Sequence, residues 1–115
     1  MFDYTKIEEN KAEFVKIVPA SELPPGERLF VEVSGKPIVL LNIAGQLFAI
    51  GDVCTHDNGP LGDGELEENE IICPRHGARF DVRNGKVMGL PAVVDVPAYP
   101  LRVVDGMIEI GIPKE

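Results

Sequence analysis

The residues of this chain best suited to binding a transition metal lie in two short segments. Residues 54–56 read Cys-Thr-His, residues 73–76 read Cys-Pro-Arg-His, and the 115-residue sequence has no other cysteine or histidine. Cysteine thiolates and histidine nitrogens are common ligands of such metals. A fold for this chain must therefore bring the two segments together, and we expect their four side chains to form a single site.

The rest of the chain consists of short apolar runs. Glycine and proline, 12 and 10 residues respectively, separate these runs about every ten residues, which is typical of an antiparallel sandwich or barrel. The sequence therefore predicts an all-β fold with one helical turn at 20–23. The expected strands lie at 14–18, 28–33, 37–43, 46–50, 70–72, 101–104 and 107–112.

Particular residues sharpen this prediction. The unbroken apolar run Ile38–Leu41 is typical of a strand buried on both faces. Asn84-Gly85 and Asp105-Gly106 each predict a hairpin with a two-residue turn, because both central positions of that turn need a positive φ. Ser34-Gly35 and Ala44-Gly45 predict further turns between strands.

The four candidate ligands fall on two loops between the expected strands. Loop one runs from about residue 53 to 65 and loop two from residue 73 to about 79, and both contain glycine. Glycines allow the backbone to approach a bound group closely and to direct N–H donors at it. The two loops are therefore the predicted binding site.

Length and charge restrict the class of protein. A chain of 12.5 kDa fits one domain, residues 1–115. Its net charge of −8 argues against binding to nucleic acid or to an anionic membrane surface. The longest uncharged stretch, 37–51, is shorter than the roughly 20 apolar residues of a membrane-spanning helix. The first 14 residues contain no apolar core of signal-peptide length. We expect a soluble, cytoplasmic protein.

Several kinds of site are compatible with two cysteines and two histidines. They could be unrelated core and surface residues, or the cysteines could form a disulfide of a secreted protein. A Cys₂His₂ zinc site is a further alternative, although zinc modules usually place both cysteines on one knuckle. In a [2Fe–2S] cluster with mixed ligands, one iron takes two thiolates and the other two imidazoles. Each loop would then supply one ligand to each iron, as the spacing here allows.

The spacing resembles the motif of the Rieske family, C-x-H-x₁₅₋₁₇-C-x-x-H. Residues 77–81, 84–87 and 90–92 also resemble that family, and the resemblance extends from about residue 14 to 112. It implies an antiparallel β fold with a cluster-binding subdomain at about 52–91, inserted in a basal domain. It also implies a proline-containing third loop over the cluster, at Leu90-Pro91.

By the same resemblance, the chain holds one Rieske-type [2Fe–2S] cluster. Its cofactor-binding residues would be Cys54 and Cys73 on the inner iron and His56 and His76 on the outer iron. No catalytic residue is expected, because four ligands leave the irons no open coordination position.

Differences from the Rieske subunits of cytochrome bc complexes indicate the branch of the family. Those subunits carry a disulfide between the loops, where this chain has Gly59 and Arg75. They also carry a serine and a tyrosine that donate hydrogen bonds to the cluster and its cysteine, where this chain has Ala78 and Phe80, which have no hydroxyl. The resemblance is therefore to the soluble, low-potential Rieske ferredoxins of bacterial ring-hydroxylating oxygenases.

A ferredoxin of this kind implies a one-electron carrier, not an enzyme acting by itself. The implied partners are a flavin-containing ferredoxin reductase and a terminal Rieske oxygenase or another redox enzyme. Two alternatives stay open at this point. One is the small Rieske-like subunit of an assimilatory nitrite reductase, and the other is a zinc-binding interaction module.

Other polar residues near the motif have weaker predicted roles. Asp57 and Asn58 could tune His56 or cap a turn, and Arg75 and Arg79 bring positive charge toward the cluster. Asp81 is expected to be structural at the start of the strand after loop two. The acidic run from Glu65 to Glu70 is most simply a solvated face.

Overall fold

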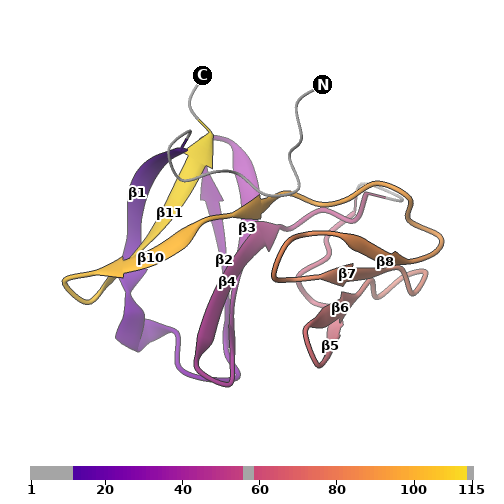
Figure 1. Ribbon diagram of the computed structural model, residues 1–115, viewed down its shortest axis with the longest axis horizontal. Helices are drawn as coiled ribbons and strands as arrows, with labels where there is room; N and C mark the ends of the chain where they lie inside the picture. The colour runs from indigo at the N-terminus through magenta and orange to yellow at the C-terminus, as the bar shows by residue number, and fades with distance from the viewer. Residues whose placement is uncertain (1–11, 56–58, 114–115) are drawn as a thin grey trace.

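The computed structural model describes residues 12–55 and 59–113, and they form an antiparallel β protein, which confirms the all-β prediction (Figure 1). The helix expected at 20–23 is a 3₁₀ turn, Ala20–Glu22. No helix in these two ranges is long and apolar enough to cross a membrane. The strands are β1 (Ala12–Pro19), β2 (Arg28–Val33), β3 (Lys36–Ile43), β4 (Gln46–Gly51), β5 (Glu65–Glu67), β6 (Glu70–Ile72), β7 (Arg79–Asp81), β8 (Val87–Gly89), β9 (Ala98–Tyr99), β10 (Leu101–Val104) and β11 (Met107–Pro113).

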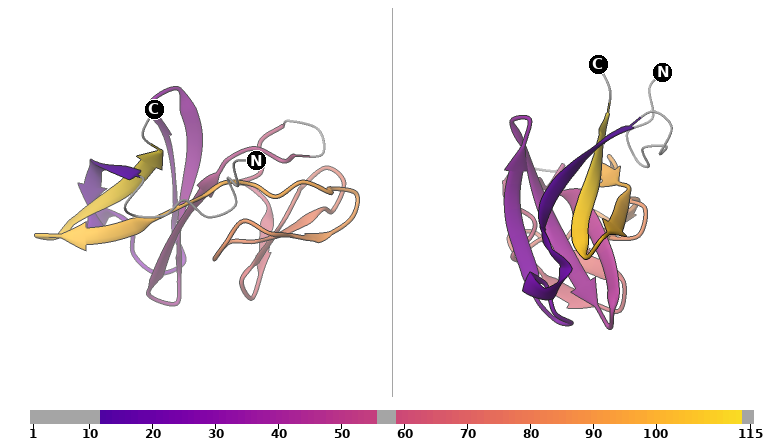
Figure 2. Two further views of the ribbon diagram at one scale, coloured as in Figure 1. Left: turned by 45° about the horizontal axis from the view of Figure 1, so that its top comes forward. Right: turned by 90° about the vertical axis from the view of Figure 1, so that its left-hand side faces the viewer.

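The strands form three antiparallel sheets. The first has the order β1-β11-β10, the second β2-β3-β4-β9 and the third β5-β6-β7-β8. The third sheet lies to one side of the other two, and the chain enters it from β4 and leaves it toward β9 (Figures 1 and 2). The limits predicted for an inserted cluster-binding subdomain, about 52–91, enclose this sheet and stay a prediction.

Strand β3 lies between two hydrophobic cores. Ile38 and Leu40 belong to the core between the first and second sheets, which also contains Ile108 and Ile110 of β11. Val39 and Leu41 belong to a second core, which contains residues of the third sheet. Because successive side chains of a strand point to opposite faces, both faces of β3 are covered, as the unbroken apolar run predicts.

Two-residue turns join several of the strands. Asp105 and Gly106 have φ values of 51° and 79° and connect β10 with β11, which confirms that hairpin. In the turns Ser34-Gly35 and Ala44-Gly45, both residues likewise have a positive φ. These turns determine the register of β2 with β3 and of β3 with β4.

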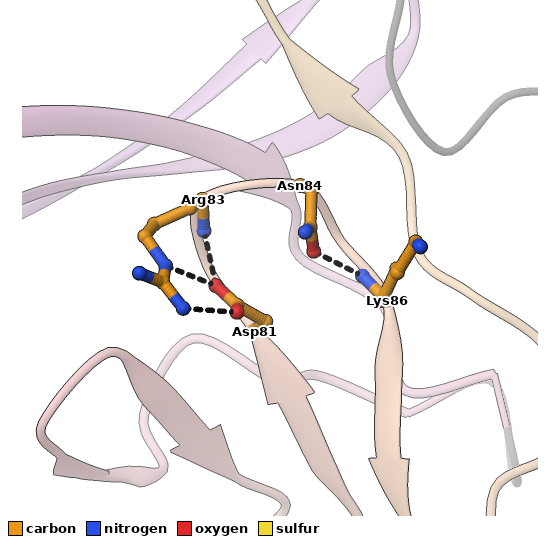
Figure 3. A network of polar contacts seen from close by, with 4 residues as sticks. All are labelled: Asp81, Arg83, Asn84 and Lys86. Atoms are coloured by element: carbon orange, nitrogen blue, oxygen red, sulfur yellow. Dashed lines mark hydrogen bonds and ion pairs between the residues drawn. The ribbon is translucent and has the colours of Figure 1, made fainter.

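A turn lies at Asn84-Gly85, but the prediction that it is a two-residue hairpin turn is wrong. Strands β7 and β8 are joined there, but only Gly85 has a positive φ, and the connection runs from residue 82 to 86. Figure 3 shows the cause: the carboxylate of Asp81 accepts hydrogen bonds from the backbone N–H and the guanidinium of Arg83. Gly85 donates its N–H to the Asp81 carbonyl over 2.7 Å. Asp81 thus organises a wider turn, and it lies at the end of β7, not at the start of the strand.

Two short strands were not expected. β5 lies within the acidic run that was interpreted as a solvated face; it pairs with β6 and keeps its glutamates at 65 and 67 exposed. β9 has two residues and pairs with β4. Neither segment has an apolar alternation long enough to predict a strand.

Candidate metal centre

Loop one begins where β4 ends, and polar contacts hold it in place. The Asp52 carboxylate accepts the N–H groups of Leu61 over 2.9 Å and of Gly62 over 2.6 Å. Within the loop, Cys54 donates its N–H to the carbonyl of Gly59 over 2.7 Å. The chain therefore folds back on itself around Cys54, and the Cys54 side chain is fully buried.

Arg28 of β2 ties the far end of loop one to the second sheet. Its Nη1 donates to the carbonyls of Gly62 and Gly64, each over 2.5 Å. A Cβ at Gly62 would lie 2.5 Å from the Phe30 ring, and one at Gly64 would lie 1.9 Å from the Ile72 carbonyl. These close approaches explain the two glycines, and they place the end of loop one against the strand that leads to Cys73.

Loop two follows β6 and is a tight turn. Cys73 donates its N–H to the carbonyl of Ala78 over 2.7 Å, and Gly77 donates to the carbonyl of Cys73 over 3.0 Å. Gly77 has a φ of +77°, which favours glycine. The turn buries the Cys73 side chain and leaves His76 exposed.

The two cysteines lie together in the core. Both belong to the core between the second and third sheets, and neither forms a disulfide. Burial acts to raise the pKa of the Cys73 thiol, but hydrogen bonds from the backbone N–H groups of Arg75 and His76, the side chain of Cys54 and the charge of Arg75 bring this pKa below its ordinary value. The surroundings of Cys73 thus favour the thiolate, which is the metal-binding form.

The two loops are bridged by Arg75. Its guanidinium donates to the carbonyl of Pro60 over 2.8 Å, and it lies so close to Gly59 that a Cβ there would be 2.7 Å from Cζ. Arg79, by contrast, pairs with Glu67 at 3.5 Å and with Glu70 at 3.4 Å. Of these two arginines, the structure therefore places Arg75 across the ligand loops and pairs Arg79 with glutamates of the third sheet.

A third segment, between β8 and β9, lies against loop one. The hydroxyl of Thr55 donates a hydrogen bond to the carbonyl of Val94. The sequence pointed to this segment through Leu90-Pro91, a cis peptide bond in the structure. It did not point to Thr55, whose role depends on a partner 39 positions away.

The structure places three of the four predicted ligands: Cys54 and Cys73 adjacent in the core, and His76 at the surface of loop two. His56, Asp57 and Asn58 lie outside the described residues. Within 12–55 and 59–113, no three His, Cys, Asp or Glu side chains converge to hold a metal ion. The donor chemistry still fits a mixed cluster: two adjacent buried thiols suit an inner iron, and an exposed imidazole suits an outer one.

Comparison with known proteins decides the family. A model of the Rieske [2Fe-2S] domain matches residues 13–100. The chain belongs to this family. As a member of it, the chain carries one Rieske-type [2Fe–2S] cluster.

Curated relatives share most of their length with this Rieske protein. The ferredoxin component of the naphthalene 1,2-dioxygenase/salicylate 5-hydroxylase systems of Ralstonia sp is 39% identical over 82 residues, which cover 71% of this chain and 79% of the relative. The 3-phenylpropionate/cinnamic acid dioxygenase ferredoxin subunit of Escherichia coli is 37% identical over 97 residues, covering 84% and 91%. These relatives are electron carriers of dioxygenase systems, and this chain is likewise an electron-transfer protein rather than a catalytic enzyme.

Solved structures agree with this assignment. The ferredoxin of carbazole 1,9a-dioxygenase from Nocardioides aromaticivorans IC177 is 33% identical with a TM-score of 0.79, covering 88% of this chain and 98% of that one. A ferredoxin in a complex of reduced oxygenase and oxidized ferredoxin of carbazole 1,9a-dioxygenase is 29% identical with a TM-score of 0.80, covering 89% and 95%. A nitrite reductase small subunit from Mycobacterium tuberculosis, at 21% identity and a TM-score of 0.79 over 90% and 98%, shares the fold alone.

Proposed function

We propose that this protein carries single electrons from a flavin-containing reductase to a terminal Rieske oxygenase in the cytoplasm. The observation that carries the proposal is the pair of adjacent, buried cysteines, Cys54 and Cys73, which form no disulfide and lie near the exposed imidazole of His76. A cluster held by such a set is shielded on its thiolate side and reaches the surface on its imidazole side. Free thiols are also typical of a reducing compartment.

The proposed ligands are Cys54 and Cys73 for the inner iron and His56 and His76 for the outer iron. When bound, the cluster supplies a centre that accepts and releases one electron. The surrounding residues bury the thiolates, direct the N–H groups of Arg75 and His76 toward Cys73 and hold the two loops together through Arg75. We propose that residues 52–91 form the unit that performs this task.

The exposure of His76 supports exchange of electrons with a protein partner. An electron carrier must bring its centre close to that of each partner, and a ligand at the surface shortens this distance. The naphthalene and phenylpropionate relatives belong to dioxygenase systems, and a solved structure holds a related ferredoxin in complex with an oxygenase. These likenesses support a terminal oxygenase as the acceptor and its reductase as the donor.

The two alternatives from the sequence have less support. The nitrite reductase small subunit resembles this chain in fold alone. The match to the Rieske [2Fe-2S] domain over residues 13–100 favours an iron–sulfur cluster over a zinc site.

The test is reconstitution with purified components. The protein should contain two irons and two acid-labile sulfides per chain, and its reduced form should give a rhombic paramagnetic signal with an average g below the free-electron value. It should then restore electron flow from reductase to oxygenase in at least one of the naphthalene, phenylpropionate and carbazole systems. Zinc without sulfide, or no electron flow in any of these systems, would contradict the proposal.

A further inference from the structure

Exposed apolar side chains gather in the segment between β8 and β9. Among the described residues, seven large apolar side chains are exposed, and four of them fall between positions 88 and 94. Their exposed fractions are 53% for Met88, 79% for Leu90, 75% for Val93 and 59% for Val94. Single exposed apolar residues are common on protein surfaces, whereas several gathered in one short segment indicate a site of interaction. We call these four residues the apolar rim.

The backbone of the rim is anchored on both sides. Val87 donates its N–H to the carboxylate of Asp95 over 2.8 Å, and Val96 donates to the carbonyl of Gly85 over 2.8 Å. Ala92 and Val96 are buried in the core that contains both cysteines. The rim is therefore a turn fixed to the third sheet, with its large side chains directed outward, and a partner need not order it on binding.

The rim contacts loop one beside Cys54. The carbonyl of Val94, one of its members, accepts the hydroxyl of Thr55, the residue after Cys54. The rim segment also lacks charge: residues 87–94 are eight uncharged positions in a chain of net charge −8. A partner seated on it would exclude water next to the ligand loops without desolvating a charged side chain of the rim.

We propose that the apolar rim, Met88, Leu90, Val93 and Val94, is the docking surface for the terminal oxygenase. The inference rests on the proposed function, because the occupant is the electron acceptor named there. An acceptor must contact the protein beside its cluster ligands, and the rim is a large apolar group in that position. A ferredoxin of similar fold forms a complex with an oxygenase in carbazole 1,9a-dioxygenase, so this class of partner binds directly. The oxygenase surface that fits the rim is apolar.

The chain contains a matched control at its opposite end. Val103 and Val104 of β10 are also exposed, at 48% and 39%. The β10–β11 hairpin that carries them lies at the opposite end of the molecule from the segment between β8 and β9 (Figure 1 and the left view of Figure 2). Substitution there replaces two exposed apolar side chains without touching the rim.

The experiment compares the double variant Met88→Ser/Val93→Ser with Val103→Ser/Val104→Ser, both loaded with cluster. Ferredoxin-dependent product formation is measured with the reductase and oxygenase of the dioxygenase system that accepts the wild-type protein. We expect the KM of the oxygenase for the rim variant to rise about tenfold, as the loss of two buried apolar contacts implies, with kcat within about twofold of the wild type. The control variant should match the wild type.

Two further readouts separate docking from other effects. The visible spectrum and the midpoint potential of the rim variant should equal those of the wild type, which excludes damage to the cluster. The rise in KM should persist in high salt, because apolar contacts are not screened as charge contacts are. Val93→Ser alone should give a smaller change in the same direction, which covers the case in which the double variant fails to fold.

The remaining outcomes overturn the inference. Equal KM values for the rim variant and the control would show that the rim does not contact the oxygenase, although the wild-type protein still supports turnover and the proposed function stands. A rise in KM for the reductase alone would assign the rim to the other partner and also contradict the inference. Failure of the wild-type protein itself to support any oxygenase would instead contradict the proposed function.

Discussion

The first two sheets and the ligand loops of this protein are held together by different forces. The core between those sheets contains apolar side chains from several strands, such as Ile38 and Leu40 of β3 together with Ile108 and Ile110 of β11. The loops also bury Cys54, Leu61 and Cys73, but individual polar contacts fix their course: Arg28 and Asp52 to loop one, and Arg75 from loop two to loop one. Apolar burial is spread over many residues and tolerates small changes, whereas a single hydrogen bond has no substitute. The comparison implies that the site can be disrupted without unfolding the sheets.

The largest expected effect is loss of the cluster from the ligand loops while the first two sheets stay folded. Cys73→Ala removes a proposed ligand, so we expect complete loss of iron and acid-labile sulfide, with lower thermal stability because cluster binding contributes to folding. The far-ultraviolet circular dichroism of the β sheets should be retained. Cys54→Ala, His56→Ala and His76→Ala should behave in the same way. Normal cluster content in any one of the four variants would remove that residue from the ligand set.

The next effect concerns the first two sheets. Ile38→Ala leaves a cavity in their core, and we expect a loss of about 2–5 kcal/mol in the free energy of unfolding. Because Ile38 lies in the core that does not contain the cysteines, the folded fraction should keep its normal visible spectrum. Denaturant titration followed at both ultraviolet and visible wavelengths checks this. A changed visible spectrum in the folded state would show that the two regions are not separate.

A smaller effect is expected where loop one is attached. Asp52→Ala removes the acceptor for two N–H groups, of Leu61 and Gly62, at a cost of about 1–3 kcal/mol. We expect faster release of iron to a chelator, since the loop that carries Cys54 is loosened, with little change in the sheets. Asp52→Asn is the matched control, because its amide oxygen can still accept both hydrogen bonds. Equal rates of iron release for the two variants would contradict this role of the acceptor.

The smallest effect is on the pH dependence of the free energy of unfolding, through the turn that Asp81 organises between β7 and β8. The hydrogen bond and charge of Arg83, opposed by burial, hold the pKa of Asp81 below its ordinary value. A carboxylate with a lowered folded-state pKa adds stability above its unfolded pKa of about 3.9, and this stability is lost as the pH falls through the folded value. Arg83→Gln should therefore reduce the acid dependence of unfolding below about pH 4, as thermal melts at several pH values would show. An unchanged acid dependence would exclude the pair as its source.

The sheets were largely predictable from the sequence because their signals are local. The run Ile38–Leu41 and the dipeptide Asp105-Gly106 each contain the information for their own structure. The turn at Asn84-Gly85 was misjudged because the side chain of Asp81, three positions earlier, controls it. Strand β5 is not predictable because two of its three residues are glutamates, and β9 is not predictable because two residues cannot display a period.

The candidate ligands of the site could be predicted from the sequence, but the contacts that hold the ligand loops in place could not. Two cysteine–histidine pairs are recognisable by spacing alone. The contacts of Arg28 with loop one join residues 34 and 36 positions apart, and such contacts leave no periodic pattern in the sequence. The apolar rim was likewise missed, because exposure depends on what the rest of the fold leaves uncovered.

The measurement that tests the account most directly is the midpoint potential of the cluster by protein-film voltammetry. A mixed-ligand cluster is assigned to the two loops, and Ala78 of loop two and Phe80 of β7, both fully buried, offer no hydroxyl to its sulfurs. Hydrogen bonds to the sulfurs stabilise the more negative reduced cluster, so their absence lowers the potential within the Rieske range of about −150 to +300 mV. We predict a midpoint below about 0 mV. A midpoint of about +250 mV, or no redox response at all, would contradict the assignment of this chain as a low-potential electron carrier.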